Sequence, residues 1–308
     1  MSPKPPHHST NPRNAFGEIA SFAFWLAKAG YKESTIRSAV SALKAVAKRI
    51  DLLDAEATKA YLARAEMGDG RKEIVAIHLA KFYKFLGVHF EKPRYNRVDK
   101  LPFIPTEGEI DALIAGLGKK SATLLQLIKE TGARPGEAWA LKWIDIDPQS
   151  MTVTITPEKG SRARRLKISN QLLAMLNVLP KEWATIFHRP DVNAIDSLEW
   201  FRRTFLNQRR EIARKLQNPR IDRISFKTLR HWKATMLYAR TKDILLVMQV
   251  LGHKNIKNTL VYTHLIDFQN DDYVCKIAGT VDEAKALVES GFEYVTSMEG
   301  VQLFRKRK

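Results

Sequence analysis

The sequence predicts a mainly α-helical protein of two domains with a small β-hairpin or sheet, an α+β fold class. The chain has 308 residues, a length that suits one large domain or two moderate ones. Its composition, 44% hydrophobic and 27% charged, is typical of globular chains that bury a real core. Apolar residues recur at helical spacing over most of the chain, and only short stretches alternate as strands do.

The N-terminal part is predicted to be a disordered tail, residues 1–15, followed by a helical domain, residues 16–98. The tail is rich in Pro, His and Asn and has no apolar segment of the kind found in signal peptides. Within the domain, Ser34 and Asp54 are candidate caps of successive helices. Lysines and arginines on the polar faces could follow a DNA backbone or only keep a helical bundle soluble.

A second domain, residues 99–272, is predicted to begin in a proline-containing linker and to continue as helices around one hairpin. Thr106 and Glu109 have the spacing of a capping box, which marks a helix start. Pro135 suits the first turn of a later helix. Residues 151–156 and 164–168 alternate like two paired strands. The last part, residues 273–308, is predicted to be a small α/β tail with one helix and a hairpin.

The charge balance predicts a polyanionic partner. The chain has 51 Lys and Arg against 33 Asp and Glu, a formal net charge of +18. Such an excess attracts nucleic acid and also acidic membranes. The longest apolar run, Ile244 to Gly252, is interrupted by Gln249 and is far shorter than the roughly 18 residues that span a bilayer. We therefore expect a nucleic-acid partner, no membrane association and a cytoplasmic location.

No metal and no cofactor are expected. The single cysteine, Cys275, cannot form a disulfide within the chain, and no Cys and His cluster has zinc-ligand spacing. A Gly-rich phosphate loop of the kind that binds nucleotides is also missing from the sequence.

Four segments carry the residue types that metal-free phosphoryl transfer needs. They are Thr131-Gly-Ala-Arg-Pro-Gly-Glu137, the hairpin turn with Lys159, Ser225-Phe-Lys-Thr-Leu-Arg-His231, and Leu251-Gly-His253 with Tyr262 nine residues later. Guanidinium groups can neutralise the charge that builds up on a phosphate under attack, and a tyrosine can attack it. Taken singly, each residue has a plainer interpretation: an intrahelical Arg134–Glu137 ion pair, a solvated basic hairpin, or a core tyrosine.

In order and spacing these segments resemble the tyrosine recombinase (phage integrase) family, and the archaeal virus and plasmid integrases in particular. The resemblance covers Thr106 to about Leu265 by motif and implies the family's architecture, a helical core-binding domain that clamps DNA plus a catalytic domain. The catalytic residues that it implies are Arg134, Lys159, Lys227, Arg230, His253 and Tyr262. Lys227 stands where the family usually has histidine. His231 and His264 flank these residues and are interpreted as structural.

The resemblance implies a site-specific recombinase or integrase that acts on duplex DNA as a homotetramer holding two DNA segments. Tyr262 would form a 3′-phosphotyrosine without ATP or metal, and Lys159 would protonate the departing 5′ oxygen. Two other functions are compatible with these residues: a type IB-like topoisomerase, and a noncatalytic DNA-binding protein with a recombinase fold.

Overall fold

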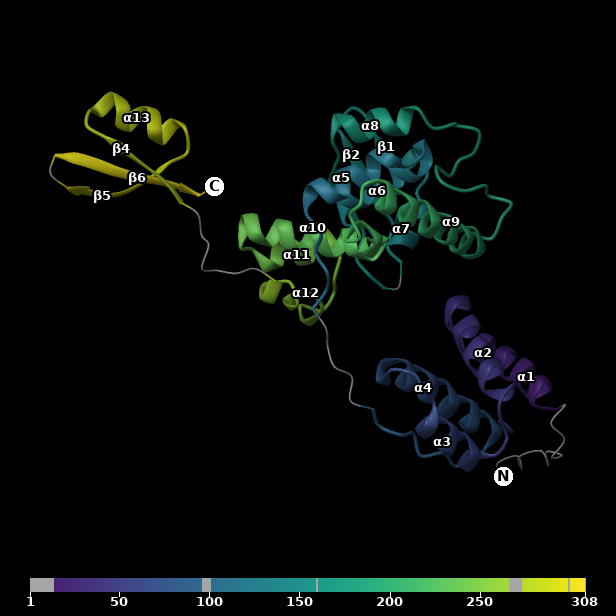
Figure 1. Cartoon of the computed structure of the whole chain (residues 1–308). Coiled ribbons are helices and arrows are strands. Elements are labelled where there is room, and N and C mark those ends of the chain that lie inside the picture. Colours follow the sequence, from purple (N-terminus) through teal and green to yellow (C-terminus); the bar gives the residue numbers. More distant parts are fainter. Residues whose placement is uncertain (1–13, 96–100, 159, 266–272, 299, 308) are drawn as a thin grey trace. The chain divides into compact units, whose positions relative to one another are not determined.

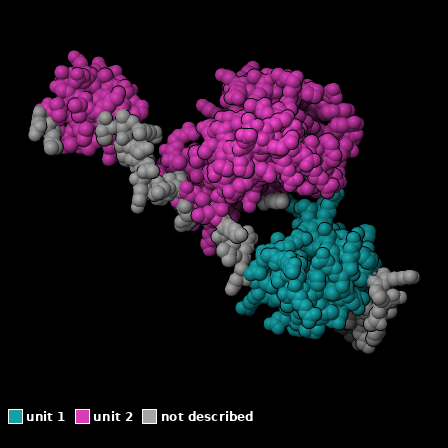
Figure 2. All heavy atoms as spheres, in the orientation of Figure 1, with its two compact units in different colours: residues 1–100 teal, residues 101–308 magenta. Residues whose placement is uncertain are grey.

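The computed structural model describes residues 14–95, 101–158, 160–265, 273–298 and 300–307. The described chain is mainly helical with two small antiparallel sheets (Figure 1), which confirms the predicted fold class. It divides into two compact units, residues 1–100 and 101–308 (Figure 2). The finer domain limits given above remain predictions.

The first unit is a bundle of helices around an aromatic and aliphatic core. Its helices are α1 (Asn14–Lys28), α2 (Glu33–Ala47), α3 (Ala55–Arg64) and α4 (Asp69–Leu86). Phe22 and Phe82 are fully buried and meet edge to face, with ring centroids 5.4 Å apart. Asp54 caps α3 as predicted. The cap predicted at Ser34 is wrong, because α2 already begins at Glu33, after Lys32, whose side chain makes no cap hydrogen bond.

From residue 101 to residue 265, the second unit contains helices packed around a central helix, with a short sheet. The elements are α5 (Glu107–Gly116), α6 (Lys119–Thr131), α7 (Pro135–Trp139), η1 (Trp143–Asp145), β1 (Ile146–Asp147), β2 (Thr152–Ile155), β3 (Arg164–Lys167), α8 (Asn170–Asn177), α9 (Ala194–Lys215), η2 (Ile221–Arg223), α10 (Phe226–Thr241), α11 (Ile244–Leu251), α12 (Lys257–Leu260) and η3 (Thr263–Leu265). The predicted capping box of Thr106 and Glu109 starts α5.

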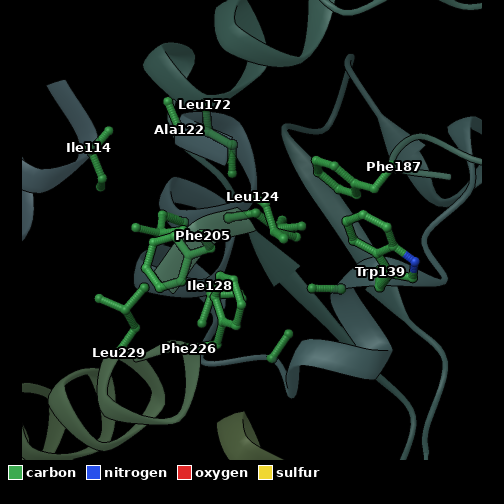
Figure 3. Close-up of a cluster of buried hydrophobic side chains, with 14 of the residues drawn as sticks. Ile114, Ala122, Leu124, Ile128, Trp139, Leu172, Phe187, Phe205, Phe226 and Leu229 are labelled. Atoms are coloured by element: carbon green, nitrogen blue, oxygen red, sulfur yellow. The ribbon is translucent and has the colours of Figure 1, made fainter. Parts of the chain in front are cut away.

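The core of this unit forms around α6, whose side chains are buried on nearly all sides. Leu124 and Ile128 of α6 are fully buried, and Phe205 from α9 and Phe226 from α10 belong to the same cluster (Figure 3). The rings of Phe205 and Phe226 stack with centroids 4.5 Å apart. Because α6 lies in this core, the residues that follow its C-terminal end have a fixed position.

The sheet is antiparallel in the order β1-β2-β3. Its β2–β3 hairpin agrees with the prediction, with Val153 opposite Leu166, whereas the two-residue β1 was not predicted. The apolar helical context of the tryptophans from Trp139 onward predicts that they pack in the core, and Trp139 and Trp232 are buried. The prediction is wrong for Trp183 and for Trp200 on α9, which are 41% and 69% exposed.

The C-terminal tail forms a sheet covered by one helix. Its elements are β4 (Tyr273–Ala278), α13 (Val281–Glu289), β5 (Glu293–Met298) and β6 (Val301–Arg307), in the antiparallel order β4-β6-β5. The helix and the last two strands were predicted, and β4 is an additional strand. Ala278 and Phe304 are buried here. Across the described residues, no helix combines the length and the apolar character that a bilayer crossing needs.

Candidate active site

Arg134 lies in the short turn that joins α6 to α7. Gly132 ends α6 in the left-handed conformation, at φ +63°, and Pro135 opens α7 as predicted. The Arg134 backbone N–H donates to Glu137 Oε2 over 3.0 Å, and Arg134 Nη1 donates to Glu137 Oε1 over 3.0 Å. The Arg134 side chain is 27% exposed. The ion pair considered in the sequence is therefore present, and it orients a guanidinium that solvent can still reach.

Glu137 is the buried anchor of this arrangement. Arg164 of β3 donates from Nη2 to Glu137 Oε2 over 2.5 Å, and the Ser161 hydroxyl donates to Oε1 over 2.8 Å. Burial by itself would raise the pKa of Glu137, but the hydrogen bonds from Arg164, Ser161 and the Arg134 backbone outweigh it and hold the pKa at about 2. Glu137 is thus a carboxylate that ties the hairpin to the turn carrying Arg134.

Arg230 connects three elements that are distant in the sequence. It lies on α10, is 6% exposed, and donates from Nη1 to the Gly132 carbonyl over 2.6 Å and from Nη2 to the Leu251 carbonyl over 2.7 Å. Burial and the charges of Arg134 and Arg164 lower its pKa to about 10. The guanidinium therefore stays positive at neutral pH and lies where the ends of α6 and α11 meet.

His253 belongs to the same cluster and is held in one tautomer. Its Nε2 lies 2.9 Å from Arg230 Nη2 and its Nδ1 lies 2.9 Å from Thr259 Oγ1. A guanidinium only donates hydrogen bonds, so Nε2 must accept and Nδ1 must carry the proton. Burial and the nearby positive charges of Arg230, Arg134 and Arg164 lower the pKa of His253 to about 4, so the ring is neutral at neutral pH.

Gly252 positions both His253 and the hairpin. It ends α11 in the left-handed conformation at φ +68°, and its carbonyl accepts from the Arg162 N–H over 3.0 Å. A Cβ at this position would lie 2.8 Å from the Arg162 carbonyl oxygen and 2.9 Å from Arg164 Nη1. Only glycine fits both the backbone angle and this close approach.

Tyr262 lies between α12 and η3 and is 2% exposed. Its ring belongs to a small apolar cluster with Ala234, Val247 and Leu251, and its hydroxyl oxygen is 3.0 Å from His231 Nδ1. Burial raises the pKa of Tyr262, and the charges of Arg230 and Arg134 partly offset that rise. The phenol is therefore protonated at neutral pH, next to two positive charges.

The remaining predicted residues have different positions. Lys159 falls outside the described residues. Lys227 is exposed on the first turn of α10, one turn before His231, and its charge is one reason for the low pKa of that histidine. His231, interpreted as structural from the sequence, contacts the Tyr262 hydroxyl directly. The side chain of His264 also lies outside the described residues.

Three contributions were missed by sequence reasoning: the contact of His231 with Tyr262, and those of Arg164 and Ser161 with Glu137. Each joins residues at least 24 positions apart, so no local spacing indicates it. The one available signal was the basic character of the hairpin, to which Arg164 contributes. Among the residues that the structure describes, no group of three or more His, Cys, Asp or Glu side chains could hold a metal.

Comparison with known families fits this geometry. The sequence model of the phage integrase family matches residues 106–268, which are 163 of the 308 residues. The chain belongs to the phage integrase family of tyrosine recombinases. The family match covers Arg134, Arg230, His253 and Tyr262. It also covers Glu137 and the hairpin residue Arg164, which form an ion pair with each other.

Two curated relatives of this integrase-family chain illustrate the range of similarity. It is 30% identical over 183 residues to the tyrosine recombinase XerC of Xanthomonas axonopodis pv. citri, covering 56% of each chain. It is 26% identical over 151 residues to a probable integrase/recombinase of Methanocaldococcus jannaschii, covering 47% of this chain and 46% of the relative. The chain thus spans about half the length of these relatives. The particular likeness to archaeal integrases stays a prediction.

Two solved structures share the fold of this integrase-family chain. One is the XerH site-specific recombinase bound to difH substrate in a pre-cleavage complex, with a TM-score of 0.60 and 17% identity over 92% of this chain and 99% of that one. The other is a lambda integrase tetramer bound to a Holliday junction, with a TM-score of 0.55 and 16% identity over 81% and 83%. At these identities the likeness concerns the fold alone.

Proposed function

We propose that this protein is a site-specific DNA recombinase, or integrase, that cleaves and rejoins duplex DNA through a 3′-phosphotyrosine at Tyr262. One observation carries the proposal: Arg134, His253 and Tyr262, from separate segments of the sequence, gather around Arg230. Tyr262 shares an apolar cluster with Leu251, whose carbonyl accepts from Arg230. Arg230 contacts His253 over 2.9 Å and the Gly132 carbonyl, two residues before Arg134. The same two arginines influence the Tyr262 hydroxyl electrostatically.

The guanidiniums have donors left for a phosphate. Arg230 uses one Nη1–H and both Nη2–H groups in the contacts given above, so its Nε–H and second Nη1–H have no acceptor within the described part of the chain. Arg134 uses a single side-chain N–H toward Glu137. Two such forks can stabilise the charge that develops on the nonbridging oxygens as phosphorus becomes five-coordinate.

The reaction conserves one phosphodiester bond. The Tyr262 oxygen would bond to phosphorus as the bond from phosphorus to the 5′ oxygen breaks, and that oxygen would take a proton, for which we propose Lys159 as donor. Attack by a 5′ hydroxyl of another strand then releases Tyr262. Because the bond is exchanged and not hydrolysed, the chemistry requires no ATP. The two guanidiniums would stabilise the phosphate charge that a metal ion stabilises in other enzymes.

Duplex DNA and a homotetramer are part of the proposal. The net charge of +18 favours a phosphate-rich partner. The XerH structure named above is bound to its substrate, and the lambda integrase assembly is a tetramer on a Holliday junction. We infer the same kind of partner and assembly here, with a clamp contribution from the helical N-terminal domain.

The test is covalent capture of DNA. The protein is incubated with a library of random-sequence duplexes that carry a nick, so that cleavage releases a short fragment and becomes irreversible. Complexes that survive denaturation are collected and their DNA is sequenced, which also gives the target site. We expect adducts with the wild type and none with Tyr262→Phe, whose DNA affinity should stay within a few fold.

The outcomes separate the candidate functions. Adducts that lead to exchanged strands between two duplexes support the recombinase. Adducts that relax supercoiled DNA without strand exchange would favour a type IB-like topoisomerase. Binding without any adduct would favour a noncatalytic DNA-binding protein and contradict the proposal.

A further inference from the structure

We propose that His231 is the base that accepts the Tyr262 proton as that oxygen attacks the scissile phosphate. This inference rests on the proposed function, since it assigns a further role in the same reaction. It concerns a residue that the family motif places only as a neighbour of Arg230.

The geometry brings the two groups into direct contact. His231 follows Arg230 on α10, whose start is fixed by a capping box at Ser225. Its Nδ1 lies 3.0 Å from the Tyr262 hydroxyl, and the ring centroids are 5.7 Å apart at an angle of 53°. The rings are therefore not stacked, and the polar atoms make the contact.

A protonated tyrosine in this position needs a base. Burial raises the pKa of Tyr262 against the influence of Arg230 and Arg134, so a free tyrosinate is rare at neutral pH. Among the described residues, His231 is the one hydrogen-bond partner of this hydroxyl. A transfer over a 3.0 Å contact has the range that general-base catalysis requires.

The His231 ring is neutral and can therefore accept a proton. Burial, followed by the charges of Lys227 and Arg230, lowers its pKa to about 4, so the ring is neutral at neutral pH. With its proton on Nε2, it accepts the Tyr262 hydrogen bond at Nδ1. A scissile phosphate bound by Arg134 and Arg230 would add negative charge beside Lys227 and these arginines, which favours the imidazolium form during the reaction.

Neither of the other two candidates can fill this role. His253 has its Nε2 lone pair directed at Arg230 and its Nδ1 proton directed at Thr259. Lys227 is exposed, and among the described residues no hydrogen bond joins it to the Tyr262 hydroxyl. In the proposed step, the bond from Tyr262 oxygen to phosphorus forms, the bond to the 5′ oxygen breaks, the phenol proton passes to His231 Nδ1, and a separate acid protonates the 5′ oxygen. Rejoining reverses each transfer.

The test separates a base from an acid and from a structural residue. His231→Ala and His231→Asn are compared with the wild type on ordinary DNA and on DNA whose bridging 5′ oxygen is replaced by sulfur. A thiolate leaves without a proton, since thiol pKa values are about 8.5. We expect single-turnover cleavage to fall by about 10²–10⁴-fold in both variants, as for loss of a general base, and to stay equally low on the sulfur substrate.

The pH dependence of cleavage by the Asn variant separates a base from a structural residue, because loss of a purely structural residue would not change that dependence. Its side chain can keep a polar contact with the Tyr262 hydroxyl but cannot take up a proton. On the sulfur substrate, its cleavage rate should rise about tenfold per pH unit between about pH 7 and 9, because only the tyrosinate fraction attacks. The wild type should be nearly flat over this range. Melting temperature and DNA affinity of both variants serve as folding controls.

Three results would overturn the inference while leaving the proposed function intact: near-normal cleavage by His231→Asn, recovery of either variant on the sulfur substrate, or parallel pH profiles of variant and wild type. The absence of any wild-type adduct would instead overturn the proposed function itself.

Discussion

At the scale of single residues, the site depends on the shape of its side chains as much as on their charge. Arg134 donates to Glu137 through one side-chain N–H, so its other N–H groups can donate to a ligand. Arg230 donates to two backbone carbonyls and contacts the ring of His253. A guanidinium can make such contacts and still face a phosphate with a planar fork. An ammonium cannot do so.

Arg134→Lys should therefore lower DNA cleavage by orders of magnitude although the charge is kept, because one ammonium cannot donate to Glu137 and grip two phosphate oxygens in parallel. Single-turnover adduct formation measures the effect. Arg189→Lys is the matched control, since Arg189 pairs with the exposed Asp191 and should change little. A near-normal rate for Arg134→Lys would assign Arg134 to structure alone.

Glu137→Gln tests the buried ion pair through its pH dependence. The pKa of Glu137 is about 2 in the folded chain, below that of an unfolded glutamate at about 4.3. The carboxylate therefore contributes stability that is complete above about pH 4.5 and is lost as the pH falls towards 2. At neutral pH the variant also leaves Arg164, whose side chain is 4% exposed, without its anionic partner.

We expect Glu137→Gln to unfold at lower denaturant concentration at pH 7 and to approach the wild type as the pH falls below about 4.5. Urea unfolding at several pH values measures this difference. If the difference in unfolding midpoint between the two proteins stayed constant from pH 7 to pH 3, Glu137 would not be a stabilising carboxylate.

At the scale of elements, the left-handed glycine that ends α11 links His253 to the hairpin. Gly252→Ala should reduce both thermal stability and cleavage, because the new Cβ would lie 2.8 Å from the Arg162 carbonyl oxygen at a φ of +68°. We expect a loss of roughly 2–4 kcal/mol from strain and overlap together.

Gly30→Ala is the matched control for this substitution. Gly30 also has a positive φ, +76°, but no atom lies within 4 Å of an added Cβ, so only the backbone strain of about 1–2 kcal/mol is expected. Thermal melting measures the loss of stability in both variants. Equal losses would show that the overlap of the new Cβ with the hairpin does not destabilise the protein.

The elements also show which features of the fold could be predicted from the sequence. The caps at Asp54 and Thr106 were predictable because their partners are two or three residues away, and the hairpin was predictable from alternation. The contacts between His231 and Tyr262 and between Glu137 and Arg164 span 31 and 27 residues. They depend on how α10, α12 and β3 pack, which no local pattern encodes. Trp200 was misjudged because an aromatic residue in an apolar helical context does not reveal which face is buried.

At the scale of the whole molecule, the tail is the part whose role is least defined by motifs. A deletion that began at Asp282 would leave β4 without its partner β6, so the cut belongs before Tyr273. In the described part of the chain, the core clusters that hold Leu229 and Tyr262 include no residue after 265. Removing residues 273–308 should therefore leave the melting temperature of the rest nearly unchanged.

If the tail serves assembly, this truncated protein should still form covalent adducts on nicked duplexes but lose tetrameric complexes and strand exchange. Sizing of protein–DNA complexes and a junction assay measure both. Strand exchange at the wild-type rate would refute an assembly role, and a joint loss of melting temperature and cleavage would indicate that the tail instead stabilises the unit that contains the site.

The central claim is that Tyr262 attacks DNA directly. The most direct measurement is to form adducts on nicked duplex DNA in excess chelator, digest the DNA and the protein, and locate the modified residue by mass spectrometry. The account predicts a nucleotide remnant on the peptide that carries Tyr262, with a yield that the chelator does not change. A remnant on any other residue, or adducts that form only when magnesium is present, would contradict it.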